Sequence, residues 1–213
     1  MMDGIFGGTD QTEREADGSL SGPMAGVVTD NRDPDGLARV RVRLPWYEDG
    51  STSYWARLAV PMGGDARGTY FLPEVDDEVL VIAEAGDPSH LYVLGSLWNG
   101  KAKPPAANDD GKNNERLIHS RSGHRLRFVD DESAPEIDLE LKDGAHIRLD
   151  KDGVLIDAGN GNSISIGSSG TVEITGAQKV ALKAPTVSVA ADASAEVKAT
   201  GTLTLKGATV QIN

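Results

Sequence analysis

The sequence predicts an all-β protein, with a small β-barrel followed by an intertwined trimeric β-helix. The first 100 residues hold short runs in which apolar and polar residues alternate, separated by turns rich in glycine and proline. From about residue 137 onward, a pair of apolar residues separated by one residue recurs along the chain. No aromatic residue follows Phe128. Residues 23–100 show no convincing helical period.

Composition and charge exclude several classes of protein. The chain has 213 residues, with 21 Lys and Arg against 33 Asp and Glu, and a formal net charge of −12. A protein whose main task is to grip nucleic acid needs a dominant basic surface, so we expect no nucleic-acid partner. Because there is no cysteine, a disulfide framework and a thiolate metal site are both excluded.

The sequence also bears on targeting. No run approaches the ~18 apolar residues of a membrane-spanning helix. Residues 1–20 have neither a basic start nor an apolar stretch, so we expect synthesis in the cytoplasm without a signal peptide. Residues 1–22 contain five acidic residues, one base and few apolar groups, which predicts a mobile N-terminal tail. Ile5 and Phe6 are its candidates for docking on a partner.

Residues 23–100 predict the barrel. The turn Asp33-Pro34-Asp35-Gly36 is preceded by Val27-Val28 and followed by the strictly alternating run 38–44, which predicts a hairpin. Three more strands are expected at 55–60, 78–83 and 90–95. A closed or nearly closed barrel is the economical way to hide the edges of so many short strands. Residues 101–130, which begin with a loop containing Pro104-Pro105, are a linker and entry to the repeat.

Residues 131–213 carry the repeat. Each unit is one short strand with two or three inward residues, and one such strand cannot form a core by itself. Three chains wound together would enclose a narrow interior and leave no lateral edge exposed. The alternative is an antiparallel β-meander, against which stand the missing aromatic residues and the scarcity of Asn-Gly turns. The expected trimer core consists of Ile147, Leu149, Val154, Ile156, Ile164, Ile166, Val172, Ile174, Val180, Leu182, Val187, Val189, Leu203 and Leu205.

Several ordered blocks resemble the barrel domain of baseplate assembly protein V and of VgrG proteins. They lie at residues 26–46, 54–62, 86–88 and 93–100, and the entry block Ser120-Arg121-Ser122-Gly123-His124-Arg125-Leu126 resembles the family's entry into its β-helix. The strongest block reads Gly68-Thr69-Tyr70-Phe71-Leu72-Pro73-Glu74-Val75-Asp76-Asp77-Glu78-Val79-Leu80-Val81. The resemblance covers roughly residues 25–213.

The resemblance implies an OB-type barrel (residues 23–100) followed by a trimeric β-helix. Such proteins form the central spike of contractile injection systems, including phage tails, type VI secretion systems and extracellular injection particles. The spike sits within the baseplate, under the tail tube, and is driven through a target envelope on contraction. VgrG proteins carry a large hub region before the barrel, whereas only 22 residues precede it here. We therefore expect separate hub and tube-end proteins as partners, a place in an assembled phage-tail-like particle, and purely mechanical contact with the envelope.

The repeat continues into residues 208–213. In the expected trimer, the C-terminal ends of the three chains would therefore expose unpaired strand edges. We expect them to be a platform for a separate tip protein of the PAAR type, with docking through Val210, Ile212 and Asn213.

Candidate chemical sites are weak. The clusters Asp76-Asp77-Glu78 and Asp130-Asp131-Glu132 are better explained as turns than as acid/base pairs, so no enzymatic activity and no cofactor are expected. The four histidines are far apart, and Asp150-Lys151-Asp152-Gly153 lacks the downstream ligands of a calcium loop, so no metal is expected.

Two other functions stay open. An OB barrel can bind oligonucleotides or saccharides, and Arg39, Arg41 and Arg43 line one strand face near Trp46. The net charge of −6 over residues 23–100 argues against a nucleic acid, so the arginine face is expected to be an interface with the hub or a neighbouring protomer, or a solvated face. A tail fibre is the second alternative, but it would usually end in a folded receptor head.

Overall fold

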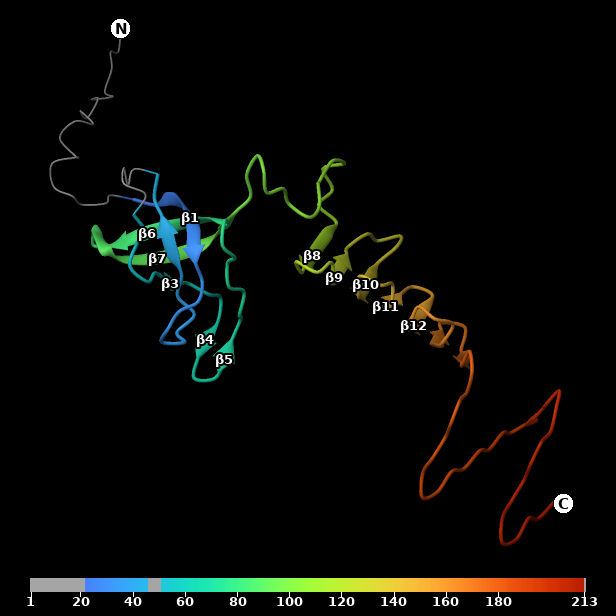
Figure 1. Cartoon of the computed structure of the whole chain (residues 1–213). Coiled ribbons are helices and arrows are strands. Elements are labelled where there is room, and N and C mark those ends of the chain that lie inside the picture. Colours follow the sequence, from blue (N-terminus) through green and yellow to red (C-terminus); the bar gives the residue numbers. More distant parts are fainter. Residues whose placement is uncertain (1–21, 46–50, 213) are drawn as a thin grey trace. The chain divides into compact units, whose positions relative to one another are not determined.

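The computed structural model describes residues 22–45 and 51–212 and contains only strands and loops over those residues (Figure 1). The predicted all-β class is therefore confirmed. The chain divides into two compact units, with the boundary between Ala107 and Asn108. Residues 1–21 of the predicted tail (1–22) lie outside the described residues, as do Trp46 beside the predicted arginine face and the predicted docking residue Asn213.

The first unit is built on a five-stranded sheet with the strand order β2-β1-β6-β7-β3. Its strands are β1 (Met24–Asp30), β2 (Arg41–Arg43), β3 (Arg57–Leu58), β6 (Glu78–Glu84) and β7 (Asp87–Leu97). β3 runs parallel to β7, and the other neighbours are antiparallel. Val40 and Ala56 exchange two backbone hydrogen bonds of 3.0 and 2.7 Å, which join the two outer strands into a closed barrel.

The barrel interior follows the alternation of the strands. In β6, Val79, Val81 and Ala83 point inward and are at most 7% exposed, whereas the residues between them are half-buried. Each fully buried valine stabilises the fold by roughly 1.5–3 kcal/mol relative to an exposed one. The core comprises ten buried apolar residues, which are Val28, Val40, Val42, Leu44, Ala56, Val79, Val81, Ala83, Leu91 and Val93.

The β1–β2 connection is organised by the Asp33 carboxylate, whose side chain is only 3% exposed. It accepts hydrogen bonds from the backbone N–H groups of Asp35, Leu37 and Arg39 at 3.1, 3.1 and 3.2 Å. It also accepts two from the Arg39 guanidinium, at 2.8 and 2.7 Å. The hydrogen bonds from Arg39 hold the pKa of Asp33 well below its usual range.

Asp33→Asn should therefore lower the melting temperature of the first unit at pH 7. The native pKa is depressed, so the carboxylate stabilises the fold above its unfolded pKa of about 3.9, and this contribution is lost as the pH falls through the native value. Melting can be followed by tryptophan fluorescence, because all three tryptophans precede residue 100. The gap between wild type and variant should shrink in acid. Asp35→Asn, at a 66% exposed carboxylate, is the control with a smaller effect, and equal melting of D33N and wild type at pH 7 would refute the prediction.

A short hairpin of β4 (Gly63–Gly64) and β5 (Arg67–Gly68) lies between β3 and β6 in the chain. We call residues 60–72, which contain it, the arm. Gly68 has φ +149°, and a Cβ there would stand 2.5 Å from the carbonyl oxygen of Met62. Only glycine lets the two sides of the arm approach so closely.

The second unit contains a seven-stranded sheet in which each strand pairs antiparallel with the next (Figure 1). Its strands are β8 (Glu115–His119), β9 (Arg125–Val129), β10 (Glu136–Glu140), β11 (His146–Asp150), β12 (Gly153–Asp157), β13 (Ser163–Gly167) and β14 (Val172–Thr175). Over these residues the structure shows the antiparallel meander that the sequence left as the alternative. The strands of this sheet pair with one another within one chain.

The reason for this difference lies in the turns. Gly123, Gly144 and Gly170 have φ of +91°, +90° and +89°, and each closes a hairpin by donating its N–H to a carbonyl three residues earlier. The residues before them are Ser122, Asp143 and Ser169, so tight turns are present although Asn-Gly dipeptides are absent at these points.

Residues 176–212 contain no strand. The predicted pairs Val180/Leu182, Val187/Val189 and Leu203/Leu205 lie in extended but unpaired chain and are 53–81% exposed. An extended segment becomes a strand only when a neighbour completes its hydrogen bonds, and one copy of the chain provides no such neighbour here.

Candidate assembly surfaces

The meander presents one continuous apolar face. Because side chains alternate across a strand, the register stacks two columns of apolar residues on the same side of the sheet. The first column runs through Ile118, Leu126, Leu139, Ile147, Ile156, Ile164 and Ile174. The second runs through Phe128, Ile137, Leu149, Val154, Ile166 and Val172, with Arg116 beside Phe128 on β8. We call these two columns the apolar face.

The apolar face is not covered within the described chain. Ile147 is 39% exposed, Ile166 48% and Val172 64%, values far above those of the barrel core. Soluble proteins rarely leave a contiguous apolar patch of this kind in water, and such patches mark interaction sites. The exposed face is therefore a candidate interaction surface.

The structure brings eight of the predicted trimer-core residues together on this face: Ile147, Leu149, Val154, Ile156, Ile164, Ile166, Val172 and Ile174. The remaining six lie in residues 176–212, where no sheet forms within one chain. Val210 and Ile212, predicted to dock a tip protein, are 53% and 84% exposed.

The opposite face of the meander is ionic. Arg127 forms ion pairs with Glu115, at 3.2 Å, and with Glu136. Arg125 donates a hydrogen bond of 2.6 Å from its Nε to the Glu140 carboxylate. Asp138, only 6% exposed, lies in register between Arg127 and Arg148. These charged side chains pair with one another across neighbouring strands, so the two faces of the sheet differ in chemistry.

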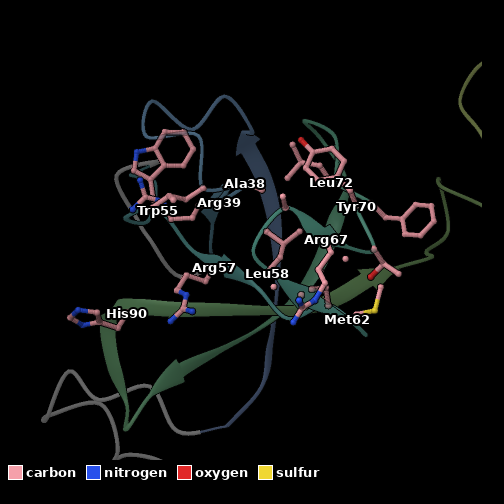
Figure 2. Close-up of a pocket in the computed structure, with 18 residues that line it drawn as sticks. Ala38, Arg39, Trp55, Arg57, Leu58, Met62, Arg67, Tyr70, Leu72 and His90 are labelled. Atoms are coloured by element: carbon pink, nitrogen blue, oxygen red, sulfur yellow. The ribbon is translucent and has the colours of Figure 1, made fainter.

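The barrel has a groove of about 900 Å³, bounded on one side by the arm. Figure 2 shows Arg39, Trp55 and Arg57 toward one side of the groove and Met62 and Arg67 toward the other. Tyr70 and Phe71, in the arm, are 72% and 66% exposed. The sequence analysis did not predict this groove. The pair Gly63-Gly64, next to the apolar residues Val60 and Met62, was a signal for an irregular segment there.

The predicted arginine face is divided in the structure. Arg39 is bound by Asp33 at 2.7 Å and by Asp35 at 2.5 Å, and Arg41 stacks over the Trp55 ring at 4.9 Å. Arg43 stays exposed on β2. The three arginines therefore do not form one free cationic surface.

The acidic clusters take part in turns. The Asp77 carboxylate accepts a hydrogen bond from the Glu74 N–H at 2.8 Å, directly before β6. Asp131 accepts from the N–H of Ser133 at 2.9 Å, and Asp130 pairs with Arg116 at 2.8 Å. Near the β6–β7 turn, hydrogen bonds from Ser89 lower the pKa of Asp87 to about 2.

Over residues 22–45 and 51–212, no group of three or more His, Cys, Asp or Glu residues could hold a metal ion. In the same part of the chain, no helix is long and apolar enough to cross a membrane.

Residues 24–98 match the family model of the type VI secretion system/phage-baseplate injector OB domain. No curated protein matches the chain. The family match covers β1 to β7 and confirms the resemblance to baseplate assembly protein V and VgrG that the sequence motifs predicted. It indicates a structural role in a baseplate or spike, association with other baseplate components, and a place in a phage-tail-like particle.

Proposed function

Because residues 24–98 match the model of the type VI secretion system/phage-baseplate injector OB domain, we propose that the chain is the central spike of a contractile injection system. In this proposal the spike links the hub and tube end to a tip protein and pierces the target envelope on contraction. The single observation that carries it is the uncovered apolar face that follows such a domain in the same chain. The role is mechanical, and no catalytic step is assigned to the acidic clusters.

The apolar face is covered by two further copies of the chain. Each face is only two side chains wide, and the strands that carry it have four or five residues. Three such narrow faces around an axis enclose a small triangular interior, which suits Ile, Leu and Val, and the single ring of the face, Phe128, lies toward its β8 end. The absence of aromatic residues after Phe128 supports this arrangement.

The unpaired segment 176–212 takes its strand partners from the other copies. Its apolar pairs continue the pattern of the meander, but the tight Ser-Gly and Asp-Gly turns that close the hairpins before residue 175 do not recur. Without such turns a strand cannot fold back on its own chain, so pairing between copies is the way to satisfy its backbone groups. Threefold intertwining is thus proposed for this segment, beyond the intrachain meander.

The barrel of the proposed spike binds the hub and tube-end proteins. In this proposal the hub is a separate chain, and the domain of this chain that meets it is the OB domain matched at residues 24–98. The barrel has its own buried core and does not need the second unit to maintain its surface.

The C-terminal end of the spike docks a PAAR-type tip protein. Val210 and Ile212 are the last two apolar residues that the structure describes and both are exposed, and Asn213 lies outside the described residues. Deletion of residues 207–213 should leave the trimer intact, because the apolar face is untouched, yet abolish capture of the tip protein in a pull-down. Normal capture by the shortened chain would contradict the assigned docking residues.

A further inference from the structure

The groove on the barrel concentrates positive charge in an acidic unit. Residues 23–100 contain 12 acidic residues and 6 arginines. The groove lining nevertheless includes three of those arginines, Arg39, Arg57 and Arg67, and no Asp or Glu. Half of the arginines of residues 23–100, and none of their acidic residues, therefore line this groove. Such a lining suits an anionic ligand.

Two of the three arginines are available to such a ligand. Arg39 is already neutralised by Asp33 and Asp35. Arg57 lies over the Tyr92 ring at 5.7 Å from its centroid and forms no ion pair with a described residue. Arg67, on the arm, likewise has no ion-pair partner in the part of the chain that the structure describes, and it faces the groove (Figure 2).

The rest of the groove is apolar and exposed. Leu37 is 65% exposed, Met62 53% and Phe71 66%, and all three line the same groove as the arginines. A short two-stranded ribbon such as β4–β5 has little stability of its own and is expected to pack on something. A segment that combines apolar side chains with carboxylates would cover both kinds of surface.

We propose that the groove is the docking site for the N-terminal segment of this chain, residues 1–21, which lies outside the described residues. Residues 1–22 contain five acidic residues and one base, a net charge of −4, and the adjacent apolar pair Ile5-Phe6. Carboxylates of this segment meet Arg57 and Arg67, and Phe6 meets the apolar wall. An extended segment of this length spans up to ~70 Å, so the groove is within its reach from Gly22.

This assignment is distinct from nucleic-acid binding. A nucleic acid is a long polyanion, and the chain as a whole carries −12, so approach is opposed over the full length of such a ligand. The N-terminal segment brings only a few charges together with apolar groups. The proposal goes beyond the spike function and does not depend on the number of copies that assemble.

The test is photo-crosslinking in the full chain, with p-benzoylphenylalanine in place of Phe6 and the products mapped by mass spectrometry. We expect crosslinks concentrated in residues 55–72, with Met62 the main acceptor. Mixing isotope-labelled and unlabelled copies tells whether the groove belongs to the same copy or to a neighbour, and both results support the proposal. Crosslinks that fall mainly outside the groove would overturn it.

Charge reversal provides the matched control. Arg57→Glu with Arg67→Glu should reduce the crosslinking yield about five-fold or more, as expected for the loss of two partly exposed charge pairs. Arg43→Glu reverses a charge on β2 outside the groove lining and should leave the yield unchanged. If the double variant melts early by tryptophan fluorescence, Arg67→Gln on the exposed arm replaces it. An unchanged yield in the folded Arg67 variant would also overturn the proposal.

Discussion

Replacement of Ile174 by Asp should prevent assembly of the chain. Ile174 lies opposite Ile164 at the last rung of the apolar face. In the proposed trimer the substitution places three carboxylates around a dry axis, and each unpaired buried charge costs several kcal/mol. We expect the variant to run as a single copy in size-exclusion chromatography with light scattering. Val172→Asp, in the neighbouring column of the same strand, should have the same effect.

The matched control is Thr175→Asp. Thr175 is the next residue of β14, and it belongs to the opposite, polar face, where it pairs with Ser163. The same charge is therefore added one residue away but in contact with water. Ile174 is 57% exposed in one copy, so I174D does not bury a charge within that copy and loss of assembly cannot be attributed to unfolding of the meander. Normal assembly of both I174D and V172D would mean that this face points outward.

Truncation after residue 107 should convert the assembly into a folded single copy. All ten residues of the buried core lie in the first unit, so the barrel retains its interior. The apolar face and the unpaired repeat are removed completely. We expect wild-type melting of the barrel by tryptophan fluorescence and the mass of one shortened chain by light scattering.

The same shortened chain separates the roles of the two units. Because the barrel surface is intact, it should still co-purify with a hub protein. A shortened chain that remains trimeric would show that the barrel, and not the apolar face, holds the copies together. Retention of the hub only by the second unit would reverse the assignment of roles.

Barrel strands were predictable where apolar residues alternate with polar ones. The alternating run at 38–44 becomes β2 and its flanks, with Val40, Val42 and Leu44 buried. The pairs Ile137/Leu139 to Val172/Ile174 likewise become β10 to β14. In both cases the period of two is a property of a single strand, and a single strand can be recognised from sequence.

Pairing and tertiary proximity were harder to predict. The hairpins of the meander depend on glycines at positive φ, such as Gly144 and Gly170, after Asp or Ser, and this turn chemistry is less distinctive than Asn-Gly. The groove was not predicted because its lining combines Arg39 and Arg57 with residues of the arm. This proximity depends on the tertiary fold and not on the pattern of any one strand. Alternation placed Arg39 on a strand face, but it could not reveal that Asp33 would bind it.

The mass of the full chain in native buffer tests the central claim most directly. One copy has a mass of 22.4 kDa. If three copies share their apolar faces, light scattering should give three times that mass over a wide range of protein concentrations. A species of 22.4 kDa, or a stable dimer, would contradict the trimeric spike.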